Sequence, residues 1–190
     1  MDGEHPLSCR VLIIPEDPTN DQHILRPLVA RLLKECGKAN AKLVVLSEPD
    51  VSGYEDACGK LPEIRKAYRR YNLLLFLPDA DGKHQSRADK FAQLEAEHGP
   101  KLVCCAAVEE VEAWLLAGHL DKLPKPWPQV RADTSVKEKV FAPFLKRHGN
   151  RRPGGGREEL MQQTLTNLPG LLGRCPELDD LQRRICEALA

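Results

Sequence analysis

Residues 72–82 read NLLLFLPDADG, and this stretch decides the fold. Its run of apolar residues, 73–77, is too short for a helix and is bounded by polar residues, so it predicts a strand buried on both faces. Asp79 and Asp81 follow this strand. Ligands bind at the carboxyl ends of the strands in open α/β sheets, so we expect both carboxylates in an active site.

Two carboxylates this close repel each other unless a positive charge lies between them. A divalent cation such as Mg²⁺ or Mn²⁺ meets this need, because it takes oxygen ligands and keeps waters for substrate phosphates. The stretch therefore indicates a metal-dependent phosphoryl-transfer enzyme with one or two bound ions. The alternative is that Asp-x-Asp-Gly is only a polar turn, since Asp and Gly favour turns.

The bulk composition limits the kinds of partner. The chain has 190 residues, with 28 basic and 28 acidic side chains, so a polyanion must be held by a local basic patch. No run reaches membrane-spanning length and Met1–His5 carry no signal pattern, so we expect a cytoplasmic protein without a membrane partner. The seven cysteines include no Cys-x-x-Cys pair, and we expect all of them to be reduced core thiols.

The rest of the chain alternates strands and helices. Further strands are expected at 9–15, 42–46 and 101–108, and helices at 21–36, 56–70 and up to 98. This alternation predicts an α/β fold with a mainly parallel four-stranded sheet flanked by helices. Later helices are expected at 109–118, from a capping box at 135–138 to 147, at 158–172 and at 176–189. We expect an α/β domain over 1–118 and a C-terminal helical extension, 119–190, packed on the same domain.

Acidic side chains follow three of the predicted strands. They are Glu16, then Asp79 with Asp81, then Glu110 with Glu112. A shared cation is the economical explanation for acids that meet at one sheet edge, and one or two metal ions there would activate water and stabilise a phosphoryl group. Alternatively, these acids only lie in the first turn of a helix, where negative charges complement the helix dipole. This alternative suits Glu109 better than Glu110 and Glu112.

The segment 146–157, KRHGNRRPGGGR, is the most basic and glycine-rich in the chain. Its glycines precede a predicted helix, so backbone amides and Arg157 could approach a phosphate. Arg151, Arg152 and Arg157 are the candidate substrate-binding residues for nucleic acid. The alternative is a surface loop with solvated charges. Trp114 and Trp127 are expected as core or surface anchors, because no aromatic residue is interleaved with this basic segment.

The acids are arranged in a way that resembles the Toprim domain of topoisomerases, bacterial primases, recombination proteins and OLD-family nucleases. A strand is followed by Glu16, a turn and a helix, and two strands later by Asp79-x-Asp81. The finer pattern resembles a family of small bacterial Toprim-like proteins of unassigned function, over nearly the whole chain. Its motifs are EDPT at 16–19, ILRPL at 24–28, LPDADG at 77–82, EVEAWLLAG at 110–118, GGR at 155–157 and CPEL at 175–178.

This resemblance implies roles for the acids. Glu16 would be the general acid/base or a metal ligand, Asp79 and Asp81 the principal Mg²⁺ ligands, and Glu110 with Glu112 a third acidic element. The chain departs from the Toprim pattern at Asp17, where the family has glycine. A second acid in this turn of relatives would match Asn20 or Asp21, and both assignments stay open.

The function expected from these residues is a Mg²⁺-dependent nuclease or related phosphoryl-transfer enzyme acting on DNA or RNA. The resemblance implies a place in a bacterial anti-phage system, with a partner ATPase or other defence protein. The alternative is a non-catalytic Toprim-like module that binds nucleic acid or protein. A small-molecule phosphotransferase ranks lowest, because no glycine-rich phosphate loop follows the first strand. His23 and His84 lie next to acidic strand ends and are expected to be polar surface residues.

Overall fold

The structure, a computed structural model, describes residues 9–190, so Met1–His5 and the expectation attached to them lie outside the described residues. The sheet has the order β2-β1-β3-β4, and every neighbouring pair is parallel. The predicted α/β class is thus confirmed, with a sheet that is parallel throughout and of Rossmann-like topology. Its strands are β1 (Arg10–Pro15), β2 (Lys42–Val45), β3 (Leu73–Leu77) and β4 (Leu102–Cys104).

The strand order reverses between β1 and β3. From β1 the chain passes outward to β2 and then returns across β1 to form β3 on its other side. Ligands of open α/β sheets bind outside the carboxyl ends of the strands at such a reversal. Pro15 of β1 pairs with Leu77 of β3, so Glu16 and Asp79 both follow the strands at this point.

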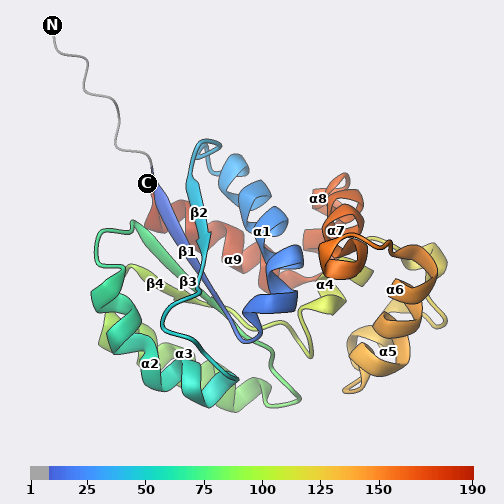
Figure 1. The fold of residues 1–190 in the computed structure, drawn as a ribbon, viewed down its shortest axis with the longest axis horizontal. Helices are drawn as coiled ribbons and strands as arrows, with labels where there is room; N and C mark the ends of the chain where they lie inside the picture. Colours follow the sequence, from blue (N-terminus) through green and yellow to red (C-terminus); the bar gives the residue numbers. More distant parts are fainter. Residues whose placement is uncertain (1–8) are drawn as a thin grey trace, which may run out of the picture.

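Helices cover both faces of the sheet. Three of them connect the strands: α1 (Pro18–Glu35), α2 (Tyr54–Ala67) and α3 (His84–His98). Figure 1 shows α2 and α3 together on one side of the sheet and α1 on the other. Side chains alternate along β3, so that Leu75 joins the core under α1 and Phe76 joins the core under α2 and α3. All five residues of β3 are buried, as predicted for a strand covered on both faces.

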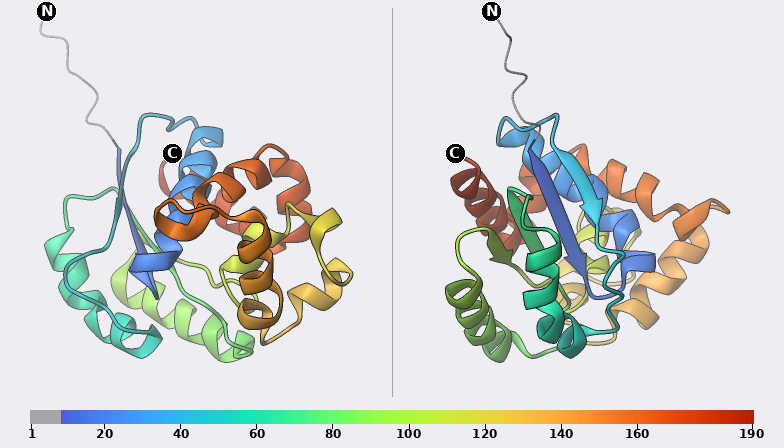
Figure 2. Two further views of the ribbon diagram at one scale, coloured as in Figure 1. Left: turned by 45° about the vertical axis from the view of Figure 1, so that its right-hand side comes forward. Right: turned by 60° about the vertical axis from the view of Figure 1, so that its left-hand side comes forward.

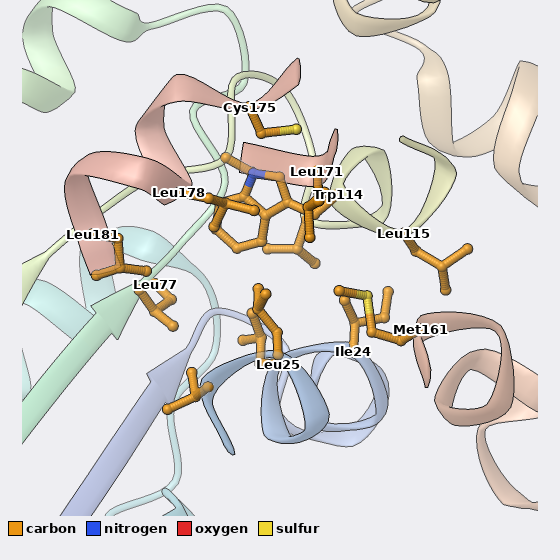
Figure 3. Close-up of a cluster of buried hydrophobic side chains, with 14 of the residues drawn as sticks. Ile24, Leu25, Leu77, Trp114, Leu115, Met161, Leu171, Cys175, Leu178 and Leu181 are labelled. Carbon is orange, nitrogen blue, oxygen red and sulfur yellow. The ribbon is translucent and has the colours of Figure 1, made fainter. Parts of the chain in front are cut away.

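The remaining helices follow β4, and all but α9 gather beside α1, away from α2 and α3 (Figure 2). Helix α9 packs against α1 and β4 and reaches α3 through the ion pair between Arg184 and Glu95. They are α4 (Glu112–Leu116), α5 (Trp127–Arg131), α6 (Ala142–His148), α7 (Arg157–Leu165), α8 (Leu168–Arg174) and α9 (Pro176–Ala188), with short 3₁₀ turns at Leu120–Lys122 and Pro153–Gly156 and a π-helical turn at Lys137–Phe141. Of the two alternatives for Trp114, a core or a surface anchor, the structure shows a core residue: its side chain is fully buried, and Figure 3 shows Leu25, Leu171 and Leu178 around it.

The helices after β4 share one core with α1 and the sheet. Gly118 makes the contact between α4 and α7 close, because a Cβ there would lie 2.3 Å from the Thr164 hydroxyl oxygen. That hydroxyl donates a hydrogen bond to the Leu115 carbonyl at 2.7 Å. The C-terminal helices therefore fix the position of the segment that leaves β4.

Several helix boundaries differ from the predicted ones. Helix α1 begins at Pro18 rather than residue 21, because the Asp17 carboxylate caps it by accepting from the Thr19 and Asn20 amides at 3.0 and 3.2 Å. The helix predicted over 158–172 is two helices, since Asn167 caps α8 by accepting from the Gly170 amide. The capping box predicted at 135–138 is not formed, and a π-helical turn leads into α6 there.

The strand predicted over 101–108 is shorter, and so is the helix predicted over 109–118. Strand β4 stops at Cys104, and one isolated bridge, between Asp79 and Ala107, continues the pairing with β3. Helix α4 begins only at Glu112. The segment between them is thus an irregular loop that carries Glu109 and Glu110 along the end of β3.

One expectation about the cysteines is wrong. Cys36 at the end of α1 and Cys186 in α9 form a disulfide, although 150 residues separate them in the sequence. Cys9, Cys58, Cys104, Cys105 and Cys175 are free, as expected. Among the helices of residues 9–190, none combines the length and apolar character required to cross a membrane.

Candidate metal centre

The backbone at the end of β3 is tied to the loop after β4. The Val111 amide donates to Asp79 Oδ1 at 2.8 Å, and the Ala80 amide donates to the Glu109 carbonyl at 3.2 Å. Asp79 is only 7 % exposed. These bonds bring the acids that follow β3 next to the acids that follow β4.

Asp81 has a left-handed backbone, with φ of 50°, and Gly82 follows with φ of 70°. Aspartate tolerates this conformation better than most residues with a side chain. The turn leaves the Asp81 side chain exposed, with Oδ2 at 3.6 Å from Arg87 Nη2. Asp81 is thus the solvent-facing acid of the site.

Three of the five predicted metal ligands meet. One carboxylate oxygen from each of Asp79, Asp81 and Glu110 lies within 4.8 Å of the others. They are respectively buried, exposed and half-buried. We call these three residues the acidic triad, and oxygen ligands in such a group suit a hard cation such as Mg²⁺.

Glu16 lies beside the triad without belonging to it. Its Oε2 accepts a hydrogen bond from the Asp79 amide at 3.4 Å, across the β1–β3 pair. On its other side, Oε1 is 3.9 Å from where a Cβ on Gly53 would lie. The structure therefore brings Glu16 to the predicted edge of the sheet, in contact with the backbone of a triad residue rather than with its carboxylate.

Glu112 and Lys137 form the inner part of the site. Glu112 is fully buried, and neither of its carboxylate oxygens has a hydrogen-bond partner among the described residues. Lys137 Nζ lies 3.4 Å from Glu112 Oε1 and 3.3 Å from Glu110 Oε2. Lys137 is thus a cation that the sequence reasoning missed, because no local pattern links it to acids 25 and more residues away.

Asp21 is a further acid of the site, which the sequence left open with Asn20 as a match to the family's second acid. It is buried in the first turn of α1, where its Oδ2 accepts from the Asp17 amide at 3.0 Å. Burial, together with the Glu112 charge and against the opposing effect of that hydrogen bond, raises its pKa to about 7. Asn20 and Asp21 were both possible matches to the second acid of the family, and Asp21 is the one that is acidic and buried near the site. The sequence indicated Asp21 only as an acid in the first turn of a helix.

Burial and mutual repulsion dominate the electrostatics of the triad. Burial, with a further contribution from the neighbouring Glu110, Asp21 and Glu112 charges, raises the pKa of Asp79 to about 9. Burial also raises the pKa of Glu110, despite the attraction of Lys137. Burial alone would lower the pKa of Lys137, but Glu112 and Glu110 raise it well above its usual range. One ammonium is shared among several acids, so protons or a further cation must supply the remaining positive charge.

These observations fit a hard cation. The donors are all carboxylate oxygens, the triad spans a distance that one ion can bridge, and a buried carboxylate without a hydrogen-bond partner lies alongside. Burying a carboxylate is costly unless it is paired or coordinates a metal, and Glu112 has only the Lys137 ammonium at 3.4 Å, which it shares with Glu110. The structure supports a site that could hold a metal ion; the identity and number of ions belong to the proposal below.

The three predicted substrate-binding arginines lie outside the triad. Arg151 and Arg157 line an open groove of about 550 Å³ together with Lys137 and Lys146. Arg152 instead pairs with Glu159 at 2.7 Å. Arg157 donates to the Gly154 carbonyl at 2.9 Å, and its Nε is buried without a hydrogen-bond partner among the described atoms. Because Lys137 contacts the acids and also lines this groove, the groove begins next to the triad.

The two histidines have different surroundings. His23 packs under the glycine run, where a Cβ on Gly154 would lie 2.5 Å from its ring. Gly154 also has a φ of 78°, so both space and backbone conformation require glycine. His84 Nε2 lies 3.2 Å from Glu109 Oε1, and the His84 side chain is half exposed. Glu109 is thus paired with a histidine, while its neighbour Glu110 joins the triad.

Comparison with protein-family models, with curated proteins and with solved structures found no match for this chain. The site is therefore argued from its own geometry, and the likeness to Toprim proteins rests on the motifs quoted above.

Stability of the metal-free protein should depend on pH through Asp21 and Asp79. Their folded-state pKa values lie above those of unfolded aspartate, so their contribution is fully present near pH 4 and is lost as pH rises through about 7 and 9. We expect the free energy of unfolding, measured by urea denaturation in EDTA, to fall by on the order of 2 kcal/mol between pH 6 and 9.

Asp79→Asn should reduce this fall, because asparagine keeps an oxygen that can accept from the Val111 amide and has no charge to desolvate. Asp50→Asn, in an exposed loop, is the matched control and should keep the wild-type profile. A wild-type stability that is flat or rises between pH 6 and 9 would show that the acids are already neutralised in another way.

Proposed function

We propose that this protein is a Mg²⁺- or Mn²⁺-dependent nuclease, or a related phosphoryl-transfer enzyme, acting on DNA or RNA. The observation that carries the proposal is the meeting of Asp79, Asp81 and Glu110 within 4.8 Å. It occurs at the carboxyl edge of the sheet, beside the point where the strand order reverses. Sheets of this kind bind their ligands there.

The acids at this edge would have different roles. Asp79, Asp81 and Glu110 would hold one or two ions, and a bound ion would polarise a phosphoryl group and activate water. Glu16 holds the Asp79 amide and keeps a partly exposed carboxylate at the same edge, so it orients Asp79 and is placed to exchange a proton with substrate or solvent. This is the acid/base role that the Toprim resemblance implies.

The groove lined by Lys137, Lys146, Arg151 and Arg157 would hold the substrate backbone. No acidic side chain of the described residues lines it. Because the whole chain has no net charge, only such a local group of cations can attract a polyanion. A strand in this groove would pass Lys137 and bring a phosphate to the triad. Membership of the Toprim-like family, an anti-phage role and an ATPase or other defence partner rest on the motif resemblance alone.

One observation favours the second candidate, a non-catalytic module that binds nucleic acid or protein. Arg87 lies 3.6 Å from Asp81, and Lys137 lies 3.3 Å from Glu110. These ion pairs partly neutralise two of the three triad acids without a metal. In such a module the acids would have a structural role, and the basic groove would be the working surface.

Cleavage assays separate the two candidates. We expect the wild-type protein to cleave plasmid DNA or RNA with Mg²⁺ or Mn²⁺, and Asp81→Asn or Glu110→Gln to lower the rate by about 100-fold or more, because each removes a ligand charge. Asp89→Asn and Glu97→Gln, exposed acids on α3, should retain wild-type rates. Undiminished cleavage by a folded Asp81→Asn protein would rule out the proposed site, and the absence of wild-type cleavage on every substrate would favour the module.

The groove has its own test. In the Asp81→Asn background, so that cleavage does not interfere, Lys146→Ala combined with Arg151→Ala should weaken binding of a short labelled duplex or single strand. The dependence of log Kd on log salt should fall by about one per lost phosphate contact. Lys34→Ala combined with Lys42→Ala removes two exposed charges elsewhere and should change neither quantity. Equal effects of both pairs would show that the groove has no special role.

A further inference from the structure

A hollow separate from the basic groove lies at the amino ends of strands β3 and β4. It is lined by Leu74 near the start of β3, Leu102 at the start of β4, and residues near the C-terminal ends of α2 and α3. The triad follows the other end of these strands. Since a five-residue strand is about 16 Å long, the hollow and the triad are separate sites.

The interior of this hollow suits a flat apolar group. Its volume is about 200 Å³, and its floor consists of the buried side chains of Leu61, Leu74 and Leu102. Tyr68 and Tyr71 form a wall, with ring centroids 5.1 Å apart in an edge-to-face arrangement. Aromatic rings on an apolar floor accept a planar ring by stacking, and nucleobases bind to proteins in this way.

The rim of the hollow is positively charged. Arg65, Arg69 and Lys101 line it with exposed side chains, and within residues 9–190 no aspartate or glutamate does. A neighbouring open hollow shares Arg69 and Tyr71 and adds further cations around a single acid; its other lining residues include Arg10, Lys66, Arg70 and Glu63. These cations would favour a ligand whose ring lies in the pocket and carries an attached anionic group.

His98 supplies a further polar group inside the pocket. It is only 6 % exposed, it lines the hollow, and no hydrogen bond joins its ring to any of the residues that the structure describes. Its ring nitrogens are not among the fully buried polar atoms without a partner, so they are open to water or to a ligand. A heteroatom on a ring held between the tyrosines and the leucines could accept or donate a hydrogen bond there.

We propose that this pocket binds a nucleotide unit, with the base on the tyrosine and leucine surfaces and the phosphate at Arg65, Arg69 and Lys101. An apolar ligand would not need the cations, and inorganic phosphate would not need the apolar floor. Free mononucleotides and the 5′-phosphorylated end of a strand share this chemistry. The proposal stands independently of the nuclease, because none of the residues involved belongs to the triad or to the groove.

The sequence carries a signal for this pocket. Residues 65–71 read RKAYRRY, in which two tyrosines alternate with basic residues. The other basic segment, 146–157, contains no Tyr, Phe or Trp. Because α2 ends at Ala67, the two tyrosines leave the helical pattern and turn together toward the sheet edge.

Calorimetric titration of the full chain in EDTA, with Lys146→Ala and Arg151→Ala to disable the basic groove, tests the pocket without involving the metal site or the groove. The probes are AMP, adenosine, inorganic phosphate and a 5′-phosphorylated thymidine pentanucleotide. We expect AMP or the pentanucleotide to bind with one site per chain and at least about tenfold more tightly than adenosine or phosphate, since each of these lacks half of the recognised chemistry. Tighter binding of AMP identifies a free nucleotide as the ligand, and tighter binding of the pentanucleotide identifies a strand end.

Variants locate the binding. Arg65→Ala and Lys101→Ala change exposed side chains and should each weaken binding about tenfold. Tyr71→Ala should weaken it as well, while Tyr71→Phe, which keeps the ring, should not. Arg183→Ala, an exposed arginine on α9, and Asp81→Asn in the triad should leave it unchanged. Binding unaffected by the Arg65, Lys101 and Tyr71 variants, binding of phosphate as tight as that of AMP, or no saturable binding of AMP or pentanucleotide would overturn the proposal.

Discussion

The parallel pairing of β1 with β3, and of β3 with β4, determines where the acidic side chains lie. Pro15 opposite Leu77 places Glu16 beside Asp79, and the bridge from Asp79 to Ala107 brings Glu110 beside Asp79. A shift in the register of β3 by one residue would reverse the faces of all its side chains and remove Asp79 from the Val111 amide. The fully buried faces of β3 prevent such a shift, so the core and the site depend on the same register.

This arrangement concentrates negative charge where solvent is scarce. Asp21, Asp79, Glu110 and Glu112 lie around one ammonium, that of Lys137, and burial keeps the Asp79 pKa near 9. Such a site holds protons when no metal is bound and releases them when one binds, because the ligands must be charged to coordinate. The π-helical turn that carries Lys137 packs against α6 and borders the basic groove, so the C-terminal helices serve the site as well as the core.

Much of this could be predicted from local patterns, and the rest depends on contacts that no local pattern records. The apolar runs predicted the strands, and the acids directly after them predicted the triad, because the ends of parallel strands meet at one edge. Lys137 and the Cys36–Cys186 disulfide were not identified, since each acts through residues distant in the sequence. Asp21 was left as one of two alternatives, because its burial beside Glu112 depends on the fold. The start of α1 was misplaced because Thr19 or Asn20 was interpreted as the helix cap, whereas Asp17 is the cap and those two residues donate to it.

The central claim is that the triad holds a divalent cation. Diffraction from crystals grown with Mn²⁺, recorded for its anomalous signal, tests this most directly. The account predicts a peak between the carboxylates of Asp79, Asp81 and Glu110, with Arg87 and Lys137 moved away from their partners. A peak only elsewhere, or none at saturating Mn²⁺ with the Arg87–Asp81 and Lys137–Glu110 ion pairs intact, would contradict it.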